Sequence, residues 1–83
     1  MSNDKGLQDA HVKIGAKQTM KLVELGQAAE VFVAEDAEHR LVSKVEALCT
    51  KHGVKITYVD TMHQLGKACG IEVGAAMAAI VKS

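Results

Sequence analysis

The chain has 83 residues, which fits one small domain spanning residues 1–83. Hydrophobic residues make up 48% of the chain and charged residues 24%, a composition typical of folded globular proteins that argues against disorder throughout. Ten Lys and Arg residues balance ten Asp and Glu residues, so the formal net charge is zero. This balance argues against non-specific coating of nucleic acid or of an anionic membrane, but it leaves room for a localised site.

The cysteines and the hydrophobic runs indicate in which cellular compartment the protein is expected. Two cysteines, Cys49 and Cys69, are too few for a disulfide-rich secreted scaffold. The first five residues lack the apolar core of a signal peptide, and no apolar run approaches the ~18 residues of a membrane span. We therefore expect a cytoplasmic protein with free thiols and no contact with a membrane.

The hydrophobic pattern alternates between strand and helix along the N-terminal half. Val12 and Ile14 form a brief apolar pair that ends at Gly15. Residues 16–25 carry apolar side chains at the i, i+4, i+7 spacing of an amphipathic helix. Residues 31–34 are a continuous apolar run, which is typical of a strand covered on both faces.

A second helix is expected after this strand. Asp36 is in a position to cap its N-terminus, and Gly53 follows its last turn, as glycine often does at the end of a helix. The buried stripe of this helix is predicted to contain Leu41, Val45 and Leu48.

The rest of the chain predicts a strand, a short helix and a final strand. The strand covers residues 54–59, and Thr61 with Gln64 forms a capping box for a helix that ends near Gly70. Residues 75–81 are ambiguous by propensity, but their position after a βαβα series favours a strand. The fold class is therefore α/β, a single-domain three-layer α/β/α sandwich around a small mixed sheet of about four strands.

The charges are unevenly distributed in spite of the zero net charge. Lys13, Lys17 and Lys21 occur without an intervening acid, whereas the stretch from Glu24 to Glu38 holds five acids and no cation. Lys17 and Lys21 share a helix face near its N-terminus, where like charge and the helix dipole are both unfavourable. A bound anion would relieve both penalties, and the alternative interpretation is a solvated lysine face.

A second unusual segment is Gly70-Ile71-Glu72-Val73-Gly74. Its two β-branched apolar residues either turn into the core or project as an apolar surface for a flat ligand such as a nucleobase. The residues themselves leave both interpretations open.

Signals for catalysis or metal binding are weak. The chain has no glycine-rich phosphate loop of the kind found in nucleotide-binding enzymes. Cys49-x-x-His52 with His63 and Cys69 is a poor basis for a metal site or a Cys–His nucleophile. We expect no enzymatic activity, no metal and no cofactor. The acidic stretch leaves a protein-interaction module as the alternative function.

Residues 15–21 (Gly-Ala-Lys-Gln-Thr-Met-Lys) and 65–76 (Leu-Gly-Lys-Ala-Cys-Gly-Ile-Glu-Val-Gly-Ala-Ala) together resemble the ribosomal protein L-seven-Ae family of kink-turn RNA-binding proteins. The resemblance runs from about His11 to Val81, includes the step Ala34-Glu35-Asp36, and is closest to short bacterial members of the family. It implies a three-layer α/β/α domain that binds a kink-turn, a sharply bent RNA duplex with tandem sheared G·A pairs. The implied partners are ribosomal RNA or riboswitch RNA and the ribosome, with the protein acting as a monomer.

The resemblance also implies a set of RNA-binding residues. The family's helix start, Gly-x-Asn-Glu-x-x-Lys, reads the edges of the G·A pairs, and its Asn, Glu and Lys fall on Lys17, Gln18 and Lys21. Lys17 can still donate to guanine O6 or N7, and Gln18 can both donate and accept. The family's apolar loop, which packs on a flipped-out nucleotide, falls on Ile71-Glu72-Val73. The implied residues are Gly15, Lys17, Gln18, Lys21, Asp36, Lys67, Ile71, Glu72 and Val73.

Overall fold

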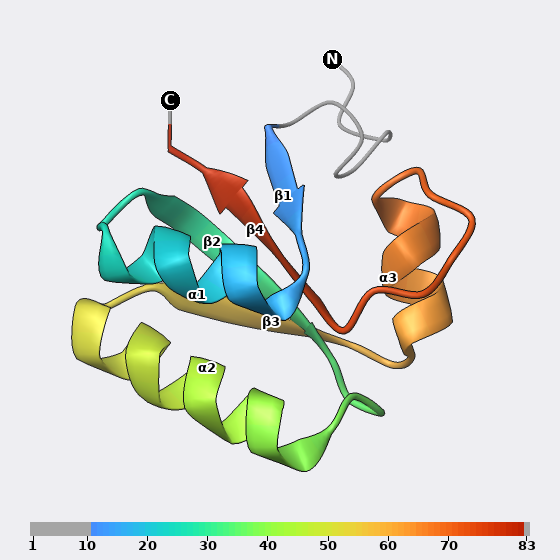
Figure 1. Cartoon of the computed structure of the whole chain (residues 1–83), viewed down its shortest axis with the longest axis horizontal. Coiled ribbons are helices and arrows are strands. Elements are labelled where there is room, and N and C mark those ends of the chain that lie inside the picture. Colours follow the sequence, from blue (N-terminus) through green and yellow to red (C-terminus); the bar gives the residue numbers. More distant parts are fainter. Residues whose placement is uncertain (1–10, 83) are drawn as a thin grey trace.

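The computed structural model describes residues 11–82 and contains three helices and four strands in that range (Figure 1). In chain order they are β1 (Val12–Ile14), α1 (Ala16–Glu24), β2 (Ala28–Ala34), α2 (His39–His52), β3 (Lys55–Val59), α3 (Met62–Ala68) and β4 (Met77–Val81). The first five residues, in which we expect no signal peptide, lie outside the described residues. Within residues 11–82, no helix has the length and apolar character needed to cross a membrane.

The four strands form one mixed sheet in the order β1-β4-β2-β3. Strand β4 lies between β1 and β2 and is antiparallel to both, whereas β2 and β3 are parallel and are connected through α2. The prediction of a final strand within residues 75–81 is therefore confirmed. Ala78 and Ala79 are fully buried in this central strand, which explains why so alanine-rich a segment is extended.

Helices α1 and α2 lie side by side on one face of the sheet (Figure 1). Alternate residues of the two central strands point into the core beneath them, because successive side chains of a strand face opposite sides. The buried residues of this larger cluster are Val23, Ala28, Val31, Val33, Val45, Cys49, Met77 and Ala79.

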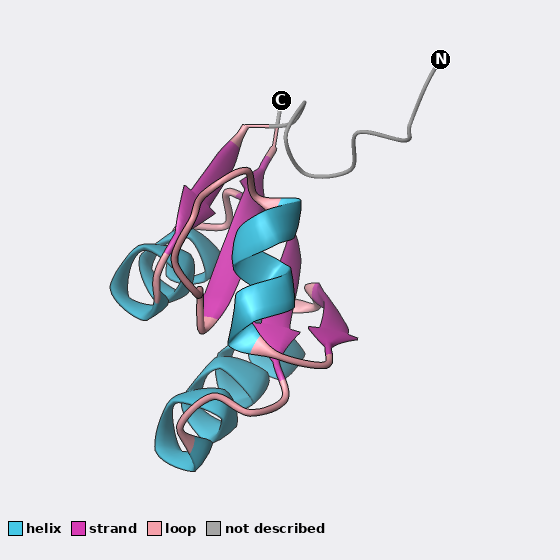
Figure 2. Cartoon of the chain, turned by 90° about the vertical axis from the view of Figure 1, so that its right-hand side faces the viewer, coloured by secondary structure: helices cyan, strands magenta, loops and turns pink. Residues whose placement is uncertain are grey.

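Helix α3 packs on the opposite face, toward one end of the sheet (Figures 1 and 2). Its core is smaller, with Ala34, Leu65 and Ala75 buried and with Phe32 and Ile80 among the half-buried residues around them. The helices thus cover both faces, and the predicted three-layer α/β/α arrangement with about four strands is confirmed.

Two local predictions need correction. Strand β2 begins at Ala28 rather than at residue 31, because the chain pairs with β4 through a register shift between Ala28 and Glu30. A continuous apolar run does not reveal such a bulged start. Asp36 does not cap α2: the N-cap residue is Glu38, and its side chain makes no capping hydrogen bond.

Candidate nucleic-acid interface

The start of α1 presents a polar face to solvent. Gly15 precedes the helix with a φ of 112°, a conformation favourable only to glycine, and its N–H donates to the carbonyl of Met77 at 2.9 Å. Lys17, Gln18 and Lys21 are all exposed, whereas Thr19 is fully buried. The helix therefore turns its anchoring side chains inward and holds donors and an amide acceptor outward on a fixed backbone.

Asp36 has a different partner from the one predicted. Its Oδ1 accepts a hydrogen bond at 2.8 Å from the backbone N–H of Met62, the first residue of α3. The chain turns first at Ala34, whose carbonyl accepts the N–H of Ala37, and α2 starts only at His39. Asp36 thus satisfies a free N–H of another helix and ties the β2–α2 loop to α3.

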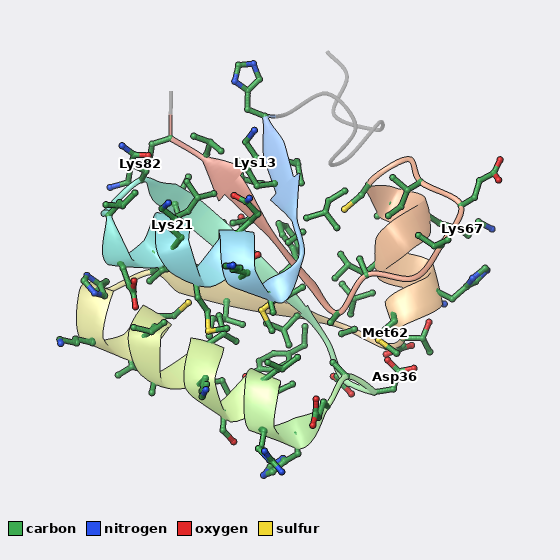
Figure 3. All side chains as sticks on the ribbon, viewed as in Figure 1. Lys13, Lys21, Asp36, Met62, Lys67 and Lys82 are labelled. Carbon is green, nitrogen blue, oxygen red and sulfur yellow. The ribbon has the colours of Figure 1, made fainter. Side chains whose placement is uncertain are left out.

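The capping box at the start of α3 is confirmed in its main contact. The Thr61 side chain accepts the N–H of Gln64 at 3.0 Å. The neighbouring Met62 was not predicted from the sequence to be exposed, but it is 36% exposed beside Asp36 (Figure 3). Nothing in the local pattern distinguishes an exposed methionine at this position from one turned toward the core.

The segment from Gly70 to Gly74 is packed tightly against α3. A Cβ atom on the buried Gly66 would lie 2.0 Å from the carbonyl oxygen of Val73, so glycine is required at this helical position. The N–H of Ile71 donates to the carbonyl of Gly66, and the N–H of Ala75 donates to the carbonyl of Met62, each at 3.0 Å. The loop is therefore held at both ends by backbone contacts. Gly66, a glycine inside the predicted helix, is the feature of the sequence that indicates this close approach.

The two apolar residues of this loop have different environments. Ile71 is half-buried and packs against the smaller core, whereas the Val73 side chain is 69% exposed. Glu72 and, in the last turn of α3, Lys67 are also exposed. Of the two arrangements that the sequence left open, Ile71 therefore turns partly into the core, and Val73 projects as an apolar surface.

Three of the candidate residues fall into two separate groups. Lys21 lies on α1 on the same side of the view as Lys13 and Lys82, whereas Asp36 and Lys67 lie together with Met62 around α3 (Figure 3). A ligand that touches both groups must extend across the molecule, as a folded nucleic acid can.

The four residues considered for a metal or a nucleophilic site are not brought together. Cys49 is buried in the larger core and Cys69 packs in the smaller core on the opposite face of the sheet. Burial raises the pKa of both thiols, which keeps them protonated and poorly reactive. No group of three or more potential metal ligands occurs within residues 11–82.

Comparison with known proteins identifies the family. Residues 4–83 match the model of the ribosomal protein L7Ae/L30e/S12e/Gadd45 family. The chain belongs to this family. Over 82 residues it is 50% identical to the RNA-binding protein BH0128 of Halalkalibacterium halodurans, covering 99% of this chain and 100% of that protein. It is 48% identical, with the same coverage, to the RNA-binding protein YbxF of Geobacillus stearothermophilus, which confirms the resemblance to short bacterial members.

Longer members of the family are similar over part of their length. The large ribosomal subunit protein eL8 of Halobacterium salinarum is 42% identical over 71 residues, 84% of this chain and 59% of that protein. The solved structure of the Giardia lamblia 15.5kD RNA binding protein superposes with a TM-score of 0.83 at 31% identity. The match covers 88% of this chain and 62% of the Giardia chain, so this chain spans less than two thirds of that protein.

Proposed function

We propose that this protein binds kink-turn RNA in association with the ribosome and stabilises the bent form of the RNA. The observation that carries the proposal is the combination of an exposed polar face at the start of α1 with Val73, an exposed apolar side chain on a backbone-anchored loop. Membership in a ribosomal protein family, and similarity to proteins named for RNA binding, support the same conclusion.

In this proposal the α1 face recognises base edges. Lys17 and Lys21 donate to acceptors such as guanine O6 and N7, and the amide of Gln18 pairs with a donor and an acceptor at once. The major groove of regular A-form RNA is too narrow for these side chains, whereas a sharp kink opens it. Recognition is therefore coupled to the shape of the RNA.

The loop makes the second contact of the proposal. Val73 packs against the flat face of an unstacked base, a contact that tolerates any base. Because the protein binds bent RNA better than extended RNA, binding shifts the RNA toward the bent population. Few phosphate contacts are needed for this, so zero net charge is compatible with specific binding.

The decisive experiment compares two RNAs of equal length and charge. One carries the tandem G·A pairs of a kink-turn, and the other has Watson–Crick G·C pairs in their place. Titration should show affinity falling by orders of magnitude for the second RNA. If most of the affinity is retained, the protein does not select the kink; if neither RNA binds, a protein-interaction module becomes the better description.

Substitutions test the recognition face separately. Lys21→Ala and Gln18→Ala should each cost ~1–3 kcal/mol of specific binding, the range for a good base-edge contact. Lys55→Ala on β3 is the control, because Lys55 is also exposed and begins the strand, at the opposite end from Val59, whose carbonyl accepts the N–H of Glu35 next to Asp36. All three variants should unfold like the wild type. If Lys21→Ala and Gln18→Ala also bind the RNA as tightly as the wild type does, the α1 face is only a solvated lysine surface.

A further inference from the structure

The outward side of α2 is a second positively charged surface that the proposed function does not use. It consists of six exposed residues that recur at helical spacing, namely Arg40, Ser43, Lys44, Ala47, Thr50 and Lys51. At 100° per residue these positions fall within a sector of about 120°, and they extend over about 16 Å of helix. We call this surface the α2 stripe.

The composition of the α2 stripe fits a polyanion. Every member is a cation, a hydroxyl residue or an alanine. Long donor side chains are therefore interspersed with small side chains, which allow the backbone of a ligand to approach. Arg40 and Lys44 are an i, i+4 pair of like charge, which is unfavourable in isolation. A row of phosphates would relieve that repulsion and accept from both the cations and the hydroxyls.

The acid nearest to the α2 stripe is directed elsewhere. Glu46 lies beside the stripe on the helix, and its carboxylate accepts a hydrogen bond from the hydroxyl of Tyr58 on β3. Glu35 and Glu38, in the loop before the helix, are exposed and close enough in sequence to Arg40 to lower the positive potential at that end of the stripe. The uncompensated part of the stripe is therefore the stretch that contains Lys44 and Lys51.

The α2 stripe begins close in the chain to one of the candidate residues, Asp36. Helix α2 starts at His39, three residues after Asp36, and it lies directly beside α1 (Figure 1). An RNA held at the α1 face and at the loop of residues 70–74 therefore has a stem that can follow this helix away from the kink.

We infer that the α2 stripe binds the phosphate backbone of an RNA stem that flanks the kink, an inference that rests on the proposed function. The contact is independent of sequence, because lysine and hydroxyl groups meet phosphates and not base edges. The contact increases the affinity for RNAs with long stems. Selection of the kink itself depends on α1 and on the loop of residues 70–74.

The test uses the full chain and kink-turn RNAs of two lengths. The short RNA ends close to the tandem G·A pairs, and in the long RNAs one stem or the other is extended by a further helical turn. The double variant Lys44→Ala/Lys51→Ala should bind one of the long RNAs about tenfold more weakly than the wild type does. The slope of log affinity against log salt should fall by about one to two for that RNA.

Three controls define the contact. The short RNA should bind the double variant and the wild type equally, and Lys44→Arg/Lys51→Arg should keep the affinity for the long RNA. Lys55→Ala removes a positive charge elsewhere and should leave the salt slope unchanged. Thermal unfolding of every variant should match the wild type, because the substituted side chains face solvent.

Each other outcome overturns the inference. If the double variant binds both long RNAs like the wild type, the α2 stripe does not contact a stem. If it loses the same affinity for the short and the long RNAs, the lysines act at the kink itself. Failure of the wild type to bind any kink-turn RNA would instead reject the proposed function, so the two failures are distinguishable.

Discussion

The two faces of the sheet are covered in different ways. Under α1 and α2, eight buried residues form an apolar cluster, whereas the cluster under α3 has three buried residues. The α3 side is held instead by close backbone packing at Gly66 and by the hydrogen bond from Met62 to Asp36. The exposed polar face of α1 thus rests on a deep core, and the loop of residues 70–74 rests on a few specific contacts. Local substitutions should therefore disturb the loop far more than the α1 face.

The largest effect is expected at Gly66. In Gly66→Ala the new methyl group would overlap the carbonyl of Val73, so α3 and the loop must move apart. We expect a loss of at least about 2 kcal/mol in unfolding free energy, as for severe overpacking, together with weaker RNA binding. Urea denaturation and RNA titration measure the two effects.

Gly74→Ala provides a graded comparison for that experiment. Its Cβ would lie 3.1 Å from the Cβ of Met62, a contact that a small shift can relieve. Its effect should be clearly smaller than that of Gly66→Ala. Equal stability of Gly66→Ala and the wild type would mean that the α3 side is not held by close packing.

Ile71 and Val73 should separate folding from binding within one loop. Ile71→Ala removes a half-buried side chain from the smaller core and should cost about 1–2 kcal/mol of stability, less than a fully buried site. Val73→Ala should change stability by less than about 0.5 kcal/mol because the side chain is 69% exposed. It should nevertheless weaken binding to different kink-turns to a similar degree. Loss of stability with intact affinity in Val73→Ala would assign that residue to the core.

The two sides also differ in how far the sequence predicts them. The spacing of Lys17 and Lys21 predicted a shared exposed face, and the stripe that includes Val23 predicted the buried one, because both depend only on helix geometry. The contact of Asp36 with Met62 and the approach of Gly66 to Val73 depend on how separate elements meet. The hydrophobic pattern along one helix or strand contains no information about how that element packs against another.

Asp36 tests the hydrogen bond that links the two sides. Asp36→Ala leaves the N–H of Met62 without its side-chain acceptor and should cost about 1 kcal/mol, the usual size of a lost cap. Asp36→Asn keeps an oxygen in the same position and should recover most of that loss. The two variants are compared by urea denaturation at neutral pH. If Asp36→Asn is as unstable as Asp36→Ala, the negative charge of Asp36, and not the hydrogen bond, is what stabilises α3.

Thr19 tests the deep core beneath α1. Its hydroxyl is fully buried and has no hydrogen-bond partner among the described residues. Thr19→Val replaces the hydroxyl with a methyl group of similar volume, so stability should rise by about 0.5–1 kcal/mol. RNA affinity should not change, because the side chain points away from the exposed face. Thr19→Ser, which keeps the hydroxyl and loses the methyl group, should be less stable than the wild type by thermal unfolding.

The smallest effect is expected at Tyr58, at the outer edge of the α2 side. Its hydroxyl donates to the Glu46 carboxylate, and this hydrogen bond is the main cause of the raised pKa of Tyr58, with burial second. Since the folded state favours the neutral phenol, the stabilising contribution of the hydrogen bond is present below pH ~10 and is lost as the pH rises through the raised pKa. The difference in unfolding free energy between the wild type and Tyr58→Phe should be constant from neutral pH to about pH 9 and should shrink above that. Because the chain has a single tyrosine, the absorbance of tyrosinate reports on Tyr58 alone. Its titration midpoint should fall in Glu46→Gln, where the acceptor is no longer charged, and an unchanged midpoint would show that Glu46 does not hold the phenol.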